Sequence, residues 1–480
     1  MKSTFDLIIT GGSLASLVAA RELSIKGKKV ALINPINHWG GHFSPLQFDG
    51  QIFDPGMVLY EFDSFSEHSD SDLVSYDPWK RNDSGRFCKK IKNFVSQHVS
   101  THVIETPKMF FNNMLFDDFL IANNLKSLLL LSPEDINNIK HELGVIINKG
   151  EINQFHASLK LNSKLFENTS YYEISVANHG NIFHEKFIEP FCKKILNISS
   201  KDIISLYHRV GWLPLFYPET LLSYINGKQT PDLKTNFSYP DGFCSTELSK
   251  LLFKKIKDCK NITIFESSKI SDLHIKDSSY EVNLEGDINV TAPFLVWGLD
   301  SSYLLQILNK KSSNTFFDKS SIGFMFLILP ESLLAQSFSI LNVLDAEFSI
   351  YRISNQTRCS GEVDINVKLS IEFNLNYFSS LYGENLSDEE IRNKLLTELT
   401  RMRIINNELS NDIFTSVKQL KNALMKPNKD NYDKFLNEYK LVCEVDPNIQ
   451  LIGPSCGFFA SSLNDQIVQG LKISEISYGH

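Results

Sequence analysis

The sequence predicts an α/β fold in which a Rossmann-like dinucleotide-binding domain is interleaved with an α+β domain. The first observation is a strand, a glycine turn and a helix at residues 5–10, 11–13 and 14–26, followed at once by an apolar run at residues 28–34. The second is a series of short strands after residue 236, which predicts that later parts of the chain return to the same sheet.

The glycine turn is the strongest functional signal. A G-x-G-x-x-G motif aligns with Gly11, Gly12, Ser13, Leu14, Ala15 and Ser16, so only the first of its three glycines is present. Serine is small, but it adds a Cβ where the backbone approaches a pyrophosphate and where the helix packs on the strand. Asn34 stands where an acidic residue usually binds the ribose, and its amide lacks that charge. A βαβ unit without a nucleotide is the alternative interpretation.

Two further glycine-containing motifs indicate which dinucleotide to expect. Residues 38–42 read His-Trp-Gly-Gly-His, with Gly40, Gly41 and His42, and residues 53–56 read Phe-Asp-Pro-Gly, ending in Gly56. Together with the opening βαβ unit they favour FAD over NAD. We therefore expect FAD as a non-covalent cofactor whose binding is weakened by the missing glycines.

The middle of the chain predicts a second segment of the dinucleotide-binding domain. Residues 239–248 read Tyr-Pro-Asp-Gly-Phe-Cys-Ser-Thr-Glu-Leu and lead into a helix. Strand patterns follow at residues 261–265, 279–284, 289–292 and 294–298. This order predicts a helix, a strand and a β-meander that returns to the parallel sheet.

The C-terminal segment predicts a strand, a loop and an amphipathic helix. The strand ends near Gly453, and Asn464 and Asp465 provide an N-cap signal near the start of the helix, just before Gln466. The positive end of such a helix would suit the electron-rich edge of a reduced flavin. A capped terminal helix without a ligand is the alternative.

These signals divide the chain into two discontinuous domains. We assign residues 1–60, 236–300 and 440–480 to the FAD-binding domain, and residues 61–235 and 301–439 to a substrate domain with helical insertions. The sequence identifies no catalytic acid or base, and the candidates for the site are His42, Arg209, Tyr351 and Arg352. Arg352 lies among aromatic residues on a predicted strand, either as a solvent-facing cation or as a clamp for an anion.

Composition excludes several other classes of protein. The chain has 480 residues, 42% of them hydrophobic, and its net charge of −8 without a basic block argues against a nucleic-acid partner. Its seven cysteines form no C-x-x-C motif, so we predict no metal site and a reducing compartment. No apolar run reaches the ~18 residues of a membrane span. We expect a cytoplasmic protein with a small-molecule substrate, and no signal reports an oligomeric state.

The order of the motifs resembles the amine-oxidase-type FAD superfamily, which includes protoporphyrinogen oxidase, phytoene desaturase and UDP-galactopyranose mutase. The resemblance rests on W-G-G-H-F, F-D-P-G, Y-P-D-G-F, I-G-P and N-D-Q-I-V-Q-G-L, spans nearly the whole chain, and is nearest to proteins of bacterial surface-sugar pathways. It implies that pyrophosphate lies at Gly11, Gly12, Ser13 and Ser16, the ribose at Asn34, flavin at Gly40, Gly41 and Gly56, and the ribityl chain and ring at Gly453, Asn464, Asp465 and Gln466.

The resemblance implies three alternative functions. The first is an FAD-dependent oxidoreductase that transfers a hydride from a small or glycoconjugate substrate to flavin N5. The second is a nucleotide-sugar mutase, which would need paired arginines such as Arg352 with Arg209 or Arg358. The third is a flavin-free subunit that binds a partner. His42, Met57 and Pro454 depart from the family pattern and weaken the FAD site that the resemblance implies. The two missing glycines, Asn34 and Pro454, which has no N–H to donate, favour the third function.

Overall fold

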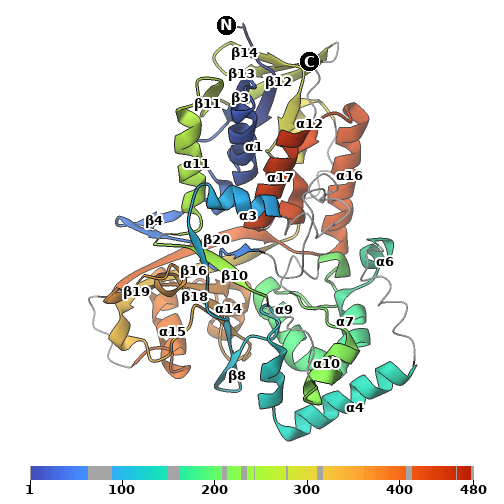
Figure 1. Cartoon of the computed structure of the whole chain (residues 1–480), viewed down its shortest axis with the longest axis vertical. Helices are drawn as coiled ribbons and strands as arrows, with labels where there is room; N and C mark the ends of the chain where they lie inside the picture. The colour runs from blue at the N-terminus through green and yellow to red at the C-terminus, as the bar shows by residue number, and fades with distance from the viewer. Residues whose placement is uncertain are drawn as a thin grey trace.

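Two large sheets organise the molecule, one in each half (Figure 1). The computed structural model describes residues 2–62, 89–149, 163–207, 213–228, 235–242, 244–276, 279–310, 317–362, 364–406, 413–460 and 462–476. A parallel sheet with its helices forms the upper half in Figure 1, and a larger mixed sheet with helices forms the lower half. The predicted fold class, a Rossmann-like sheet interleaved with an α+β part, is confirmed.

The parallel sheet is built from segments that are far apart in the sequence. Its order is β11 (Ile262–Glu266), β3 (Val30–Asn34), β2 (Leu7–Thr10), β15 (Leu295–Trp297) and β21 (Gln450–Leu451). Every neighbouring pair in it is parallel. Both β2 and β3 are buried along their whole length, which explains why each reads as an uninterrupted apolar run.

Helices cover both faces of this sheet. On one face, α1 (Leu14–Ile25), α3 (Lys89–Ser96), α11 (Glu247–Lys257) and α17 (Leu463–Glu475) share a core with alternate residues of β2 and β3. On the other face lie α12 (Ser301–Ile307), α16 (Lys429–Val445) and the meander β12 (Ile270–Lys276), β13 (Ser279–Leu284) and β14 (Ile288–Ala292). The short strand β1 (Lys2–Thr4) extends the meander by pairing with β14.

The two faces of the larger sheet differ in composition. Its order is β20 (Phe414–Met425), β16 (Lys319–Pro330), β19 (Asn366–Asn374), β18 (Ile350–Asn355), β17 (Ile340–Val343), β8 (Lys108–Phe111) and β9 (Met114–Asp117). One face packs on α14 (Leu375–Tyr382) and α15 (Asp388–Arg401). Buried polar residues such as Arg352, Ser370 and Glu372 share the opposite face, because they pair directly across β18 and β19 or alternate along them.

Small sheets connect the two halves. The hairpin of β4 (Leu46–Phe48) and β5 (Gln51–Phe53) packs on β16, where Phe53 and Phe326 have ring centroids 4.9 Å apart. A second small sheet joins β6 (Tyr60–Glu61), β10 (Phe237–Pro240) and β7 (Thr101–Val103). The chain thus passes between the halves beside the predicted site residue Gly56.

The remaining helices form a wing at the lower right of Figure 1. We define the helical wing as α4 (Pro133–Lys149), α7 (Tyr171–His179), α8 (Asn181–Phe183), the π-helical turn η4 (His184–Ile188), α9 (Glu189–Leu196) and α10 (Pro218–Ile225), with the segments between residues 199 and 216 that the structure describes. Phe119, Phe183 and Phe187 lie at its core.

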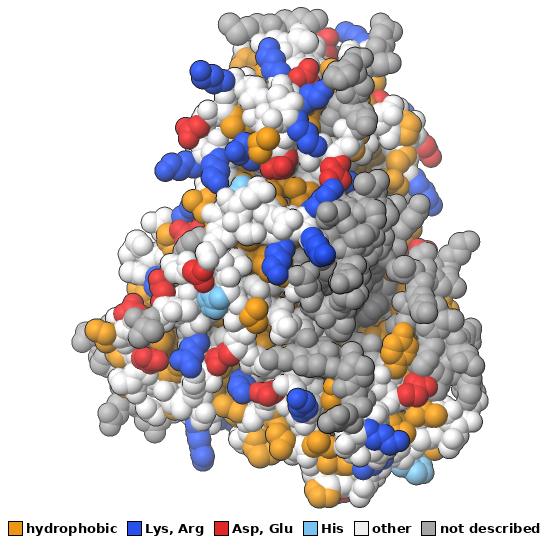
Figure 2. Space-filling view, viewed as in Figure 1, with side chains coloured by type: hydrophobic (Ala, Val, Ile, Leu, Met, Phe, Trp, Pro, Cys, Tyr) orange, Lys and Arg blue, Asp and Glu red, His pale blue; other side chains and the backbone are white. Residues whose placement is uncertain are grey.

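The other short elements are η1 (Gly41–Phe43), η3 (Leu125–Leu130), α6 (Ser163–Asn168), η5 (Ser205–Tyr207), η6 (Glu331–Leu333), α13 (Gln356–Cys359) and η7 (Gly453–Ala460). Figure 2 shows basic and acidic side chains interspersed over this face of the molecule, with hydrophobic side chains gathered at its lower end. Within the described ranges, no helix is both long and apolar enough to cross a membrane.

Candidate functional site

The N-terminus of α1 lies at the centre of the predicted cofactor site. Ser13 is the N-cap, and its Oγ accepts a hydrogen bond from the Ser16 N–H at 3.2 Å. The Ala15 N–H, in the same first turn of the helix, donates to Oε1 of Gln466 on α17 at 3.0 Å. The first N–H groups of a helix are the donors that usually hold a phosphate. Here two of them bind side chains of the chain itself.

The glycines around this turn make close contacts with protein atoms. Gly11 has φ +85°, and a Cβ there would overlap the Gly298 carbonyl. Gly40 donates its N–H to the Gly12 carbonyl at 2.6 Å, and a Cβ on Gly453 would lie 2.7 Å from the Ser13 Oγ. The predicted glycines therefore do permit close approach. The atoms that approach them belong to other parts of the chain and not to a cofactor.

Asn34, the predicted ribose ligand, points into the protein. It is the last residue of β3 and is 1% exposed. Its Nδ2 donates to the His38 carbonyl at 2.9 Å, which fixes the turn that leads to Gly40. The amide that would bind a ribose hydroxyl is thus used to hold this turn.

The start of α17 also binds the protein. Its N-cap is Ser462, two residues before the predicted Asn464, and a capping box joins Ser462 to Asp465. Asn464 accepts from the Glu61 N–H at 3.2 Å and donates to the Glu61 carbonyl at 2.7 Å. Gln469 accepts from the Gly453 N–H at 2.8 Å. These contacts hold α17 against β6 and the end of β21.

These contacts test whether the residues fit a dinucleotide. The structure brings together the predicted residues at 11–16, 34, 40–41, 453 and 464–466, which the sequence separates widely. Ser13, Ala15, Asn34 and Gln466 are at most 5% exposed, and they contact one another or adjacent backbone. A dinucleotide needs open space along the turn, so in this arrangement the residues do not fit FAD.

A buried ion pair lies on the face of the larger sheet opposite α14 and α15. Arg352 on β18 and Glu372 on β19 are directly opposite each other, and the guanidinium binds the carboxylate through Nε and through Nη2, the latter at 3.1 Å from Oε1. Arg352 is 9% exposed and Glu372 3% exposed. Arg352 is therefore not a solvent-facing cation, and its Nε and Nη2 are bound by Glu372, whereas its Nη1 has no hydrogen-bond partner among the described residues.

The predicted flavin-contact residue Gly56 lies against this ion pair. Its φ is +82°, and a Cβ there would overlap the Glu372 carboxylate. The Gly56 N–H donates to Ser370 Oγ at 3.1 Å, and the Met57 N–H donates to Glu372 Oε1 at 3.2 Å. The segment after β5 is thus bound to the sheet, and Glu372 joins it to Arg352.

Two buried aspartates were missed by the sequence reasoning. Asp118 accepts the N–H groups of Leu120, Ile121 and Ala122 and the Asn342 amide, and burial raises its pKa to about 6. Asp54 accepts the N–H groups of Ser245 and Thr246, and burial raises its pKa as well. Asp54 was visible in the F-D-P-G motif, whereas Asp118 carried no signal in the sequence.

The other candidate residues are spread over the molecule. His42 lies in η1 with its ring 4.2 Å from that of Phe43, and Tyr351 is buried on β18, where its ring centroid is 5.4 Å from the Arg352 Cζ. Arg209 lies outside the described residues. In the part of the chain that the structure covers, no three His, Cys, Asp or Glu side chains are arranged to hold a metal ion.

Comparison with known proteins shows which solved structures share this fold. No protein-family model and no curated protein matches the chain. Reduced UDP-galactopyranose mutase matches with a TM-score of 0.65 and 12% identity, over 98% of this chain and 95% of that chain. Cyclohexylamine oxidase from Brevibacterium oxydans matches with a TM-score of 0.61 and 12% identity, over 98% of both chains.

Putrescine oxidase bound to putrescine matches with a TM-score of 0.60 and 11% identity, over 99% of both chains. The chain has the fold of the amine-oxidase-type FAD superfamily. The resemblance predicted from the order of the motifs is therefore confirmed for the fold. At 11–12% identity these matches establish the fold alone, and the fold serves both oxidases and a mutase.

Proposed function

We propose that this chain is a non-catalytic protein of the amine-oxidase fold, which binds a partner and no flavin. The observation that carries the proposal is the hydrogen bond from the Ala15 N–H to Gln466 at 3.0 Å. It fills the position at which the helix N-terminus would otherwise hold a pyrophosphate. The contacts of Ser13 with Ser16 and of Asn34 with His38 support the same conclusion.

Binding FAD would require several of these contacts to break together. Each buried donor or acceptor left without a partner costs about 1–3 kcal/mol, so the dinucleotide would have to replace every one of them. Asn34 would meet the ribose without a negative charge, and Pro454 has no N–H to offer. The closed arrangement is therefore favoured over a bound cofactor.

The test is flavin binding by the full-length protein. We expect no flavin absorbance bands after gel filtration, and no rise in Tm with FAD in excess. A ligand at 100 times its Kd stabilises a protein by about 2.7 kcal/mol, so even micromolar binding would raise Tm measurably. Riboflavin, which lacks the pyrophosphate, controls for adsorption of the ring. FAD bands that survive gel filtration would overturn the proposal.

An FAD-dependent oxidoreductase in the cytoplasm is the second candidate, supported by the full-length match to putrescine and cyclohexylamine oxidases. It requires α17 to withdraw Gln466 from α1. If FAD were retained, reduction by amines or by nucleotide sugars would separate an oxidase from a mutase. The mutase has less support, because Arg352 is paired with Glu372 and Arg358 lies 3.5 Å from Glu105.

A further inference from the structure

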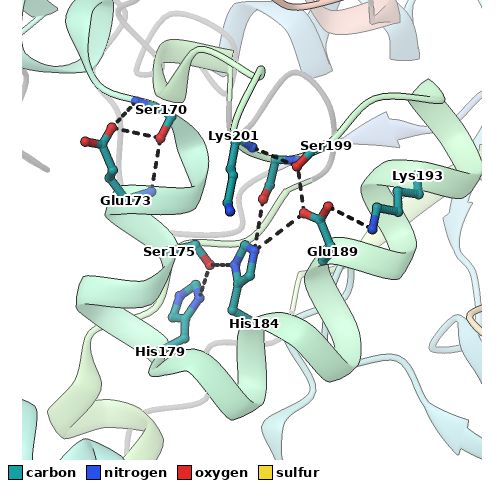
Figure 3. Close-up of polar contacts among 10 residues, drawn as sticks. Ser170, Glu173, Ser175, His179, His184, Glu189, Lys193, Ser199 and Lys201 are labelled. Carbon is teal, nitrogen blue, oxygen red and sulfur yellow. Dashed lines mark hydrogen bonds and ion pairs between the residues drawn. The ribbon is translucent and has the colours of Figure 1, made fainter.

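A chain of buried polar side chains runs through the helical wing (Figure 3). Ser175 lies between two imidazoles, 3.0 Å from His179 Nδ1 and 2.7 Å from His184 Nδ1. His179 accepts the Phe216 N–H at 2.9 Å through Nε2, and His184 Nε2 contacts Ser200 Oγ at 2.9 Å. Ser175, His179 and His184 are all 0% exposed.

The backbone fixes the direction of the hydrogen bonds made by His179. A backbone N–H only donates, so His179 Nε2 is an acceptor and His179 Nδ1 carries the hydrogen, which it donates to Ser175. With a neutral His184, the Ser175 hydroxyl donates to His184 Nδ1, and His184 Nε2–H points to Ser200 and to Glu189, 3.7 Å away. Because the inner end is a backbone amide, the chain cannot conduct a proton.

The contact between His179 and Phe216 joins two helices of the wing. His179 is the last residue of α7, and Phe216 lies two residues before the start of α10. The Tyr171 hydroxyl donates to the Pro214 carbonyl at 2.5 Å and supports the same segment. Leu213 and Phe216 are buried, so residues 213–216 are packed as well as hydrogen-bonded.

A proton added to His179 would have to break this contact. Its only free ring position is Nε2, toward which the Phe216 N–H already points, so two donors would then face each other. The groups packed around His179 do not compensate the charge: they are Ser175, the rings of Phe183 and Phe216, and, beyond Ser175, His184. Burial, assisted by His184, lowers the pKa of His179 to about 3.

Glu142 of α4 accepts the Ile182 N–H at 2.9 Å and would lie 2.5 Å from a Cβ on Gly180, the residue after His179. The other charged groups near this chain of side chains lie beside His184. Glu189 is 3.3 Å from Lys193 and binds the Ser200 N–H, and its pKa is lowered by hydrogen bonds to His184 and Ser200 although desolvation alone would raise it. Lys201 lies over the Tyr172 ring, whose edge meets His184. The groups beside His184 therefore act on His184 and not on the contact with Phe216.

We propose that the contact between His179 and Phe216 is an acid-sensitive clasp, which releases residues 213–216 and the start of α10 from α7 as the pH falls below about 6.5. The sign follows from linkage. The open state takes up a proton below the ordinary pKa of histidine, about 6.5, whereas the closed state does not until far lower pH. The clasp is thus fully formed above that pH and weakens below it.

The size of the effect follows from one proton. Between pH 7.5 and 5.5 the equilibrium constant for local opening should rise about tenfold, because one histidine with an ordinary pKa of about 6.5 is protonated in the open state alone. Hydrogen exchange of the full-length protein, corrected for intrinsic exchange rates, measures this constant for peptides covering residues 171–179 and 213–221. We expect protection there to fall about tenfold, by the same linkage.

Two variants make the test specific. In His179→Gln the side-chain oxygen accepts the Phe216 N–H and does not titrate, so protection should be equal at the two pH values. In His141→Gln, which alters an exposed histidine of α4, protection should fall as in the wild type. Equal protection of the wild type at both pH values would overturn the proposal, and so would a fall in His179→Gln.

A second measurement holds even if His179→Gln does not fold. Nitrogen-15 spectra of the imidazoles report the charge and tautomer of each histidine in the wild type. We expect His179 of the closed form to stay neutral with hydrogen on Nδ1 at pH 5.5. A charged His179 in a wing that remains closed would refute the clasp.

Discussion

Gln466 Oε1 lies 3.0 Å from the nitrogen of Ala15, so a side chain of the last helix caps the first helix. The two helices approach closely because Gly470 of α17 lies against α1: a Cβ there would be 2.7 Å from the Ala15 carbonyl. This contact joins α1 and α17 at the position that a cofactor would need. The predictions below concern this contact and the buried polar residues behind it.

Replacing Gln466 with alanine should destabilise the protein by about 1–3 kcal/mol, because the buried Ala15 N–H then has no acceptor. Chemical unfolding measures the loss. Gln97→Ala is the matched control, since Gln97 is exposed after α3 and should change stability by less than about 0.5 kcal/mol. Equal effects of the two substitutions would mean that the Gln466 contact contributes nothing to stability.

Gly56→Ala should be far more damaging than Gly50→Ala. Both glycines have positive φ, +82° and +77°, so both variants carry the backbone strain. A Cβ added at Gly50 would have no atom within 4 Å, whereas a Cβ added at Gly56 would meet the Glu372 carboxylate. We expect about 1 kcal/mol for Gly50→Ala and at least about 3 kcal/mol for Gly56→Ala. Thermal unfolding of both variants tests the difference.

Removing one partner of the buried ion pair should be costly. Arg352→Met leaves Glu372 buried without its cation, and we expect a loss of about 3–5 kcal/mol. The double variant Arg352→Met/Glu372→Gln should recover part of it, because no unpaired charge remains. The exposed pair of Arg401 and Glu347, with side chains 47% and 49% exposed, is the control. Breaking it should cost at most about 1 kcal/mol, and a similar loss at both pairs would contradict the argument.

Asp118 should give stability a pH dependence opposite to that of His179. Burial raises its pKa to about 6, so at a pH just below 6 Asp118 still holds a proton in the folded chain, whereas in the unfolded chain it has already lost that proton. This residue therefore destabilises the fold above pH 6, and the penalty shrinks by about 1.4 kcal/mol per pH unit as the pH falls from 6 toward 4.

The variant Asp118→Asn removes that titration. Asn342 Oδ1, which is buried without a partner among the described residues, can accept the new amide if the Asn342 side chain turns. We expect the variant to be more stable than the wild type at pH 8, with a difference in Tm that narrows toward pH 4. A difference in Tm that stays constant with pH would show that Asp118 is already ionised throughout this range.

The fold was predictable because it depends on local patterns. The apolar runs of β2 and β3 around Gly11 require a parallel strand pair with a tight turn, and the segment at 239–248 does lead into α11. The contacts of the site were not predictable, because they join residues that are distant in sequence. Nothing near Gln466 indicates that it binds Ala15, and nothing near Arg352 indicates that Glu372 lies opposite.

The N-cap of α17 shows the same limit at short range. Asn464 and Asp465 are both good capping residues, and the sequence placed the cap there. The structure uses Ser462 as the cap because Asn464 binds the Glu61 backbone of β6. Asn464 could have served either as the cap or as the partner of β6. Its contact with a strand some 400 positions earlier decides between these two roles, and local sequence propensity gives no information about such a contact.

The dependence of α1 on α17 also has a consequence during translation. Leu14, Leu17, Val18 and Leu23 of α1 are all buried, and part of their cover comes from a helix made 451 positions after Ala15. At about 5–20 residues per second the ribosome needs roughly 20 to 90 s to supply that helix. During this interval the nascent chain carries an apolar helix with an incomplete cover, so we expect it to depend on chaperones until α17 has been made.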